Sequence, residues 1–428
     1  MSGGSASSRN QLSARPRRPT GQLLPLRTFY FFSFGALGAL FPYLPLLLSA
    51  RGLDAAQISW VMVLTPAANL VVPPLWGALA DVLNARLMLL RAASLGCAGA
   101  VLLLLPAWRP DMVLWGSLFA VGVLSFFRAP LTSLADAAVF SALGGRRASF
   151  SLVRVWGSGG FLLCVLTLGL LKGSLNPPLL LGATSGIYLA ASLSLLPMRK
   201  PPYLRERGVV RQTLGILAHT PMVLFLAGSA CYYMGHATYD AYFSLHARAL
   251  GHGDDLIGMA WAVGVGVEVF VMLLAPRVMG RLRSGTLLTF CAAVAGIRWL
   301  LLSMVTARVG LLLLQSLHGV TFGLWYLSLV QFIQNRAPER LRTSLQSATL
   351  SAMGLGMVTG YLGGGALMKG WGGRRLYQAA ACCASGAVPL YAGCVLTDPG
   401  SPVGPDASPS DRADPPAPRP PPSPAGGA

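Results

Sequence analysis

Long apolar stretches, each of about 20 residues or more and poor in charge, recur along the whole chain. A membrane-spanning helix needs about 20 consecutive apolar residues, so length and lack of charge are enough to predict such a helix. Each stretch is therefore predicted to be a transmembrane helix. The twelve stretches cover residues 25–49, 57–81, 87–106, 111–141, 149–172, 178–197, 221–246, 256–280, 285–305, 308–335, 342–369 and 375–396.

The longest polar break between these stretches follows the sixth and covers residues 198–220. We expect this break to be a cytoplasmic linker between two six-helix bundles, residues 25–197 and 221–396. Residues 1–24 are polar, contain no apolar core of a cleaved signal peptide, and are predicted to be a cytoplasmic segment. Residues 397–428 are rich in Pro, Ser and Ala and are predicted to form a disordered cytoplasmic tail.

The composition supports a membrane protein. Hydrophobic residues make up 54% of the chain and charged residues 11%, whereas soluble domains carry about 25% charged residues. So few charges could not cover the surface of a soluble protein of this size, which excludes an ordinary soluble enzyme, a disordered chain and a secreted disulfide scaffold. The seven cysteines lie in apolar stretches without the spacing of metal ligands, so we expect buried, unreactive thiols.

The net charge of +19 does not indicate a nucleic-acid partner, because basic residues of membrane proteins concentrate in cytoplasmic loops. With the N-terminus inside, 22 of the 33 basic residues lie in predicted inner segments, 8 in outer segments and 3 within helices. This bias predicts a multi-pass protein of the plasma (inner) membrane with both termini cytoplasmic. The expected partners are a small-molecule substrate and the lipid bilayer, and the expected state is a monomer.

Seven ionisable residues lie within the predicted helices, where an unpaired charge is costly and is usually functional. A purely structural ion pair between helices remains the alternative for each of them. The seven are Arg128, Asp136, Arg154, Asp240, Glu268, Arg298 and His318.

Helical rise predicts that several of these residues lie at the same depth. Asp136 and Arg154 flank a predicted inner turn at similar distances, so both are expected about 13 Å into the membrane. In the second half, Arg298, His318 and Glu268 are also expected near mid-depth. Two polar clusters at one depth, one in each half, predict a central cavity, where transporters bind their substrates.

Each residue type suggests a role. Arg154 or Arg298 could hold a carboxylate or polar oxygens through a guanidinium fork. Asp136 could orient Arg154 or accept a hydrogen bond from a substrate hydroxyl. His318 can bind substrate or exchange protons, and a desolvated Glu268 could carry the coupling proton.

Asp81, Arg86 and Asp240 are candidates for gating. Asp81 ends the second predicted helix and could pair with Arg86 to stabilise one conformation, or could be a solvated carboxylate at the membrane edge. Asp240 could lie in the cavity or near an outer gate.

Trp156, two residues after Arg154, could stack on a substrate ring, although packing against lipid or the core is equally open.

No zinc-protease, serine-centred or paired-aspartate motif occurs in the predicted helices, and no nucleotide-binding motif or soluble domain is present. We therefore expect a protein that is not an enzyme and not an ATP-driven pump. It would have no cofactor or metal, and a proton would be its coupling ion.

Five short motifs resemble the major facilitator superfamily, and within it the branch of lactose permease and the phenylpropionate permeases. The resemblance extends over residues 25–396. The motifs are Pro130-Leu131-Thr132-Ser133-Leu134-Ala135-Asp136-Ala137, Arg154-Val155-Trp156-Gly157-Ser158, Gly266-Val267-Glu268-Val269, Gly296-Ile297-Arg298-Trp299 and Gln315-Ser316-Leu317-His318.

The resemblance implies an all-α membrane protein with twelve helices in two pseudo-symmetric bundles, alternating access and proton symport. The spacing from Asp136 to Arg154 matches the acidic-to-arginine spacing that binds sugar in lactose permease. That permease has an acidic proton carrier at the position of Thr321, so coupling here would depend on Glu268 or His318, or be absent. The tryptophans beside the two arginines, Trp156 and Trp299, resemble the phenylpropionate permeases and favour an aromatic acid.

The sequence therefore predicts a secondary active transporter that takes up a small organic solute together with protons. An aromatic or other organic acid is favoured, and a sugar or nucleoside is possible. The alternatives are an efflux carrier for lipophilic compounds and an uncoupled uniporter.

Overall fold

A computed structural model describes residues 20–106, 108–143, 150–171, 176–198, 217–279, 281–336 and 341–397. Nearly all of these residues are helical, and no strand occurs among them. Most of the predicted linker, residues 198–220, and the predicted terminal segments lie outside the described residues.

The first half of the chain is built from helices that follow one another through short connections. They are α1 (Thr20–Leu40), α2 (Leu44–Ala50), α3 (Ala55–Met62), α4 (Leu64–Leu83), α5 (Arg86–Leu102), α6 (Val113–Leu143), α7 (Phe150–Leu170) and α8 (Pro177–Ser194). Local chemistry explains some of their ends. The Asp54 side chain accepts a hydrogen bond from the backbone N–H of Gln57 and caps α3, and Asn84 ends α4 in the left-handed conformation.

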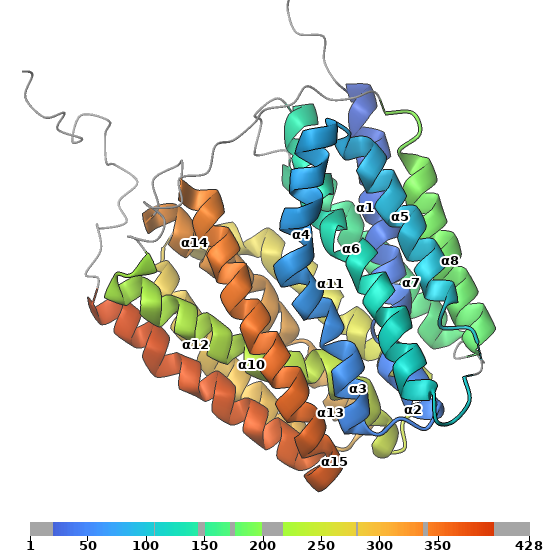
Figure 1. Cartoon of the computed structure of the whole chain (residues 1–428). Helices are drawn as coiled ribbons and strands as arrows, with labels where there is room; N and C mark the ends of the chain where they lie inside the picture. Colours follow the sequence, from blue (N-terminus) through green and yellow to red (C-terminus); the bar gives the residue numbers. More distant parts are fainter. Residues whose placement is uncertain are drawn as a thin grey trace, which may run out of the picture.

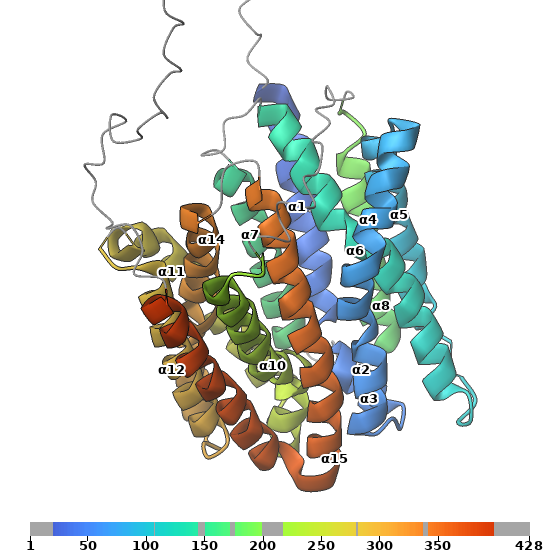
Figure 2. The same cartoon turned by 60° about the vertical axis from the view of Figure 1, so that its left-hand side comes forward.

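The second half contains longer helices and one π-helix. They are α10 (Thr220–Ala249), α11 (Asp254–Met279), α12 (Ser284–Leu302), α13 (Arg308–Gln315), the π-helix η2 (Gly319–Leu324), α14 (Trp325–Arg336) and α15 (Arg342–Thr397). The long α15 bends at Gly372, whose φ of 74° favours a residue without a side chain. The bend produces the two limbs of α15 that are visible in Figure 2.

All twelve predicted stretches coincide with helices in their described parts. Eight stretches of the described chain are long and apolar enough to cross a membrane by themselves, and the bent α15 counts as one of them. The helices α5, α8 and α10 are not among these eight. The number of twelve crossings therefore stays a prediction.

The helices form two groups that pack mainly within themselves (Figure 1). In the first group α1 packs against α7 and α8, and in the second α10 packs against α15. Two apolar clusters form the core, one mainly in each group, and each also takes in buried residues of the other group, such as Tyr242 in the first cluster and Phe161 in the second. Between the groups, α7 packs against α11, and α3 and α4 pack against α15.

The elements α2, α3 and the bend of α15 lie at the same end of the molecule (Figures 1 and 2), and several close contacts between the two groups are made there. Here Lys369 Nζ lies 2.9 Å from Asp54 Oδ2. The Ser244 hydroxyl donates a hydrogen bond of 2.6 Å to the Pro42 carbonyl. Gly169 and Gly258 also pack backbone against backbone, because a Cβ built on either would lie 2.6 Å from the other's Cα. We call this the joined end.

Candidate functional site

The first charged cluster brings together three helices of the first half. Asp136 of α6 faces Arg154 of α7, with 3.7 Å between Asp136 Oδ2 and Arg154 Nη1. Tyr30 of α1 donates a hydrogen bond to Asp136 Oδ1. The predicted meeting of Asp136 and Arg154 at one depth is therefore present in the structure. We call Tyr30, Asp136 and Arg154 the first-half cluster.

An aromatic surface supports this cluster. Phe34 lies one turn after Tyr30 on α1, and the two rings stack with centroids 6.0 Å apart. The Arg154 guanidinium lies 5.9 Å from the centre of the Phe34 ring. The side chains of Arg154 and Asp136 are 40% and 28% exposed. The arginine and the carboxylate are therefore partly exposed and only loosely paired.

The second charged cluster lies in the second half around Arg298 of α12, which is 0% exposed. Its guanidinium donates to Gln315 Oε1 and to Thr321 Oγ1, both at 2.8 Å, and lies 3.2 Å from His318 Nδ1. The Tyr239 and Trp299 rings also lie within 5 Å of the guanidinium carbon, at 4.8 and 4.6 Å. Neutral acceptors and rings thus surround this arginine.

Two histidine–carboxylate pairs complete the second cluster. His318 Nε2 lies 3.7 Å from Glu268 Oε2, and His236 Nε2 lies 3.9 Å from Asp240 Oδ1. The two imidazole rings are 5.7 Å apart. The structure therefore brings together Glu268, Arg298 and His318, as their predicted depths required. We call these three residues, with His236 and Asp240, the second-half cluster.

The π-helix η2 positions part of this cluster. His318 immediately precedes η2, and Thr321 lies within it. Gly319 and Gly323 allow close packing on α11, because a Cβ on Gly323 would lie 3.2 Å from Glu268 Cγ. Single π-helical turns inside α-helices are frequent at functional sites. Within this turn, Thr321 accepts a hydrogen bond from Arg298.

The two clusters act on each other electrostatically. The positive charge of Arg154 interacts with Glu268 and with Tyr326 of the second half. Within the second-half cluster, Arg298 acts on Asp240. Together the two clusters define a candidate solute and proton site between the halves.

The two tryptophans next to the arginines differ in their exposure. Trp156 lies about 200° around α7 from Arg154, on the same stripe as the exposed Leu152 and Leu163. Trp299 is completely buried against Arg298. The buried Trp299 ring is not accessible to a solute, whereas a role for the exposed Trp156 ring in binding a substrate stays a prediction.

The gating candidates have different outcomes. The side chain of Asp81 lies outside the described residues, and Arg86 is half-buried at the start of α5. Asp240 pairs with His236 in the second-half cluster.

Sequence reasoning missed several partners. Tyr30 and His236 carried no motif that would have marked them, because only the packing of other helices gives them their roles. Gln315 belongs to one of the five motifs, but its hydrogen bond with Arg298 was not predicted. The pair of Asp54 and Lys369 across the halves was also missed. Its only signal was the capping pattern of Asp54 and Gln57, which predicts a helix start and not a contact.

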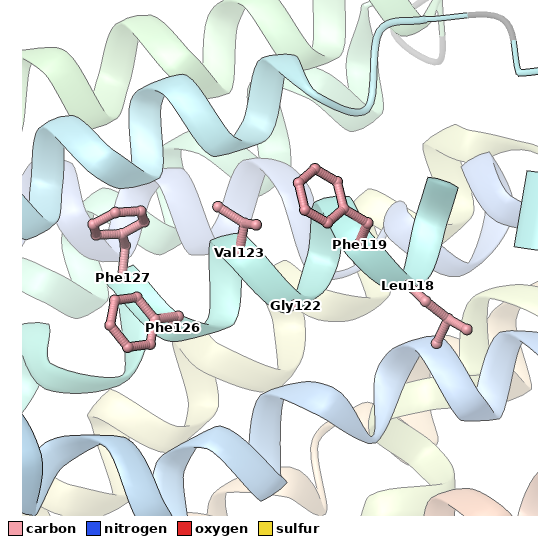
Figure 3. Close-up of a pocket in the computed structure, with 6 residues that line it drawn as sticks. All are labelled: Leu118, Phe119, Gly122, Val123, Phe126 and Phe127. Carbon is pink, nitrogen blue, oxygen red and sulfur yellow. The ribbon is translucent and has the colours of Figure 1, made fainter. Parts of the chain in front are cut away.

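A groove of about 480 Å³ on the outer face of α6 is a poor candidate for the solute site (Figure 3). Every residue that lines it is apolar or glycine: Leu118, Phe119, Gly122, Val123, Phe126 and Phe127. Such a lining suits lipid chains.

Comparisons with known proteins agree with this architecture. The model of the MFS_1 like family matches residues 23–379. The maltose permease of Geobacillus stearothermophilus is 29% identical over 349 residues, which cover 80% of this chain and 87% of that protein. The probable 3-phenylpropionic acid transporter of Escherichia coli (strain K12) is 26% identical over 235 residues, covering 54% of this chain and 61% of that protein.

A solved structure of the nucleoside transporter NupG has the same fold, with a TM-score of 0.73 and 16% identity. The match covers 88% of this chain and 98% of that one. The resemblance to the major facilitator superfamily and to its permeases is confirmed. The chain belongs to the MFS_1 like family of this superfamily, and it is a multi-pass membrane transporter.

Proposed function

We propose that the protein is a proton-coupled symporter that carries a small, neutral, hydroxyl-rich solute of the sugar type across the plasma membrane by alternating access. One observation carries this proposal. The first-half cluster presents a partly exposed arginine and carboxylate only 3.7 Å apart above an aromatic ring.

The chemistry of this pair suits hydroxyl groups. A sugar hydroxyl both donates and accepts, so neighbouring hydroxyls can donate to Asp136 and accept from Arg154. The Phe34 ring beside them offers a surface for the apolar face of a pyranose. An organic anion would compete with Asp136 for Arg154 and would bring two carboxylates together. The similarity to a maltose permease over 80% of the chain supports the sugar class.

For the proton we propose the Glu268–His318 pair as the carrier. The two side chains are mostly buried and 3.7 Å apart, and Thr321 is engaged by Arg298. Arg154 acts electrostatically on Glu268. A solute that draws the Arg154 guanidinium towards its hydroxyls changes the field at Glu268, which gives a physical route between solute binding and proton binding.

The arrangement of the halves suits alternating access. The contacts between the groups concentrate at the joined end, and a closed end opposite a more open one is the arrangement that such a cycle alternates. With both termini cytoplasmic, the joined end would face outwards.

The first experiment uses proteoliposomes that contain the purified protein and an internal pH dye. Maltose, uridine and 3-phenylpropionate are added one at a time, and proton entry is recorded together with uptake of the labelled compound. We expect proton entry with the sugar. Uptake without acidification would make the protein a uniporter, and proton entry with 3-phenylpropionate alone would replace the sugar by an aromatic acid.

Protein-free liposomes and the variant Arg109→Gln serve as controls, because Arg109 is an exposed loop residue far along the chain from both clusters. An efflux carrier for lipophilic compounds would behave differently. It would bind through apolar surface, so its transport would tolerate Arg154→Ala.

A further inference from the structure

A small cavity of about 110 Å³ lies within the first half, beside the first-half cluster. It is bordered by α1, α4, α6 and α8, and Phe34 belongs both to its wall and to the surface next to Arg154. More than half of its residues carry polar side chains: Ser33, Asn69, Arg128, Thr132 and Tyr188. Arg128 lies within the membrane-crossing α6 and has no role in the solute and proton site.

The charge of Arg128 lacks the compensation that the other interior arginines have. Among the described residues, no carboxylate lies within 4 Å of it, whereas Arg154 has Asp136 and Arg298 has three neutral acceptors. The other polar residues that line the cavity with Arg128 are uncharged, and they include Tyr188. A cation at this depth needs water or an anion to offset its desolvation.

The lining of the cavity favours an anion. Arg128, Asn69, Ser33 and Thr132 all provide hydrogen-bond donors, and none of the lining residues is acidic. Water occupies about 30 Å³ per molecule in the liquid, so the volume suits a monovalent ion with part of its hydration, or a carboxylate group. It is too small for a sugar ring together with its hydroxyls.

We propose that this cavity is a binding site for a small monovalent anion, held by Arg128 with Asn69, Ser33 and Thr132. The same chemistry has two sources, a free halide such as chloride or the carboxylate of a small organic acid. The site is separate from the Asp136–Arg154 pair and does not depend on the identity of the transported solute.

The test uses the purified full-length protein in detergent, without any solute. Chloride binding is measured from the broadening of the ³⁵Cl NMR line, and acetate binding from the transverse relaxation of its methyl protons. We expect saturable binding of at least one probe. Arg128→Gln should weaken it at least about tenfold, because the substitution removes a charged hydrogen-bond donor.

Two further variants keep the test decisive. Arg109→Gln removes an exposed arginine that lies outside the cavity and should bind as the wild type does. The double variant Ser33→Ala, Thr132→Val keeps the Arg128 charge but removes two donors, and it should weaken binding about fivefold. This second variant remains informative if Arg128→Gln does not fold.

Tighter binding of chloride would identify a free halide as the ligand, and tighter binding of acetate would identify a carboxylate. Absence of saturable binding of both probes would overturn the proposal. Equal binding by the wild type and by both cavity variants would also overturn it. Because no transported solute is present in this binding test, a negative result would overturn only the anion site. The proposed transport function is tested separately in proteoliposomes.

Discussion

The first-half and second-half clusters use similar residue types in different ways. In the first half Arg154 is 40% exposed and loosely paired with one carboxylate. In the second half Arg298 is completely buried, and its two Nη atoms contact Gln315, Thr321 and His318. An arginine that can exchange partners suits solute binding, whereas a buried arginine held by three neighbours suits a fixed scaffold. Glu268 and Asp240 therefore face His318 and His236 instead of Arg298. Such a pairing suits a carboxylate that takes up and releases a proton.

The largest expected effect is a loss of affinity for the solute when Arg154 is replaced, because the comparison assigns solute binding to Arg154 and not to Arg298. Arg154→Gln should weaken binding of the transported sugar at least about tenfold and up to about a hundredfold, because it removes hydrogen bonds from a charged donor. Binding is measured by isothermal calorimetry on the purified protein. Arg154→Lys keeps the charge but not the fork and should also bind poorly. Normal binding by both variants would contradict the assignment of the solute site.

The second-largest expected effect concerns the coupling of solute transport to protons. Glu268→Gln should abolish accumulation of solute against a gradient in proteoliposomes but leave exchange of labelled for unlabelled solute intact, because the amide cannot carry a proton. Asp240→Asn is the matched control, since Asp240 also faces a histidine at a similar distance. Accumulation of solute against its gradient by Glu268→Gln would refute the role of Glu268 as proton carrier. Loss of that accumulation in Asp240→Asn alone would assign proton coupling to the His236–Asp240 pair.

Stability should distinguish the arginines in the opposite order. Arg298→Gln leaves the buried acceptors of Gln315 and Thr321 without their donor, which should cost about 2–4 kcal/mol of unfolding free energy. Arg154→Gln, at a partly exposed site, should cost less than about 1 kcal/mol. Thermal and denaturant unfolding in detergent measures both. If Arg298→Gln were stable but did not bind solute, Arg298 would be a substrate ligand, as the sequence suggested.

A smaller effect is expected at the joined end. Asp54→Asn keeps a good helix cap for α3 but removes the charge that pairs with Lys369. An exposed ion pair contributes about 0.2–1 kcal/mol. The conformation in which the two halves are separated at the joined end should therefore become up to about fivefold more populated. Spin labels attached at Ser49→Cys and Trp371→Cys, one on each half, report the distance between the halves by double electron–electron resonance. An unchanged distance distribution in both Asp54→Asn and Lys369→Met would exclude this pair from gating.

The pH dependence of the same pair follows from its chemistry. The backbone N–H of Gln57, and then the Lys369 ammonium, hold the pKa of Asp54 below its ordinary value of about 3.9. A carboxyl whose pKa is lowered in the folded state contributes its stabilisation above the ordinary value and loses it as the pH falls through the lowered one. The label separation should therefore be constant from pH 5 to 8 and should increase only below about pH 4. An increase near pH 6 would implicate another group.

The smallest expected effect concerns Trp156. Trp156→Leu should change solute binding by less than about twofold, because the ring lies on the exposed stripe of α7 with Leu152 and Leu163. The same calorimetric titration measures it. A large loss of binding would place the ring in the solute site and restore the aromatic acid as a substrate.

Much of the architecture could be predicted from particular residues. The apolar stretches predicted helices in the right places because a bilayer imposes their length, as for α12, predicted at 285–305 and found at Ser284–Leu302. Helical rise also predicted that Asp136 and Arg154 would meet, since two antiparallel helices that share a turn return to equal depth. The same argument brought His318 to Arg298.

Depth along a helix is therefore a property of the sequence itself, because each residue adds a constant rise. Direction around the helix, and the neighbours that a side chain meets, depend on how segments distant in the chain pack. Trp156 and Arg154 are two residues apart but face opposite sides of α7, and only its packing against α1 and α11 decides which side faces the site. In the same way, the burial of Arg298, the partnership of Asp54 with Lys369, and the cavity around Arg128 depend on several helices at once, so only the tertiary structure decided them.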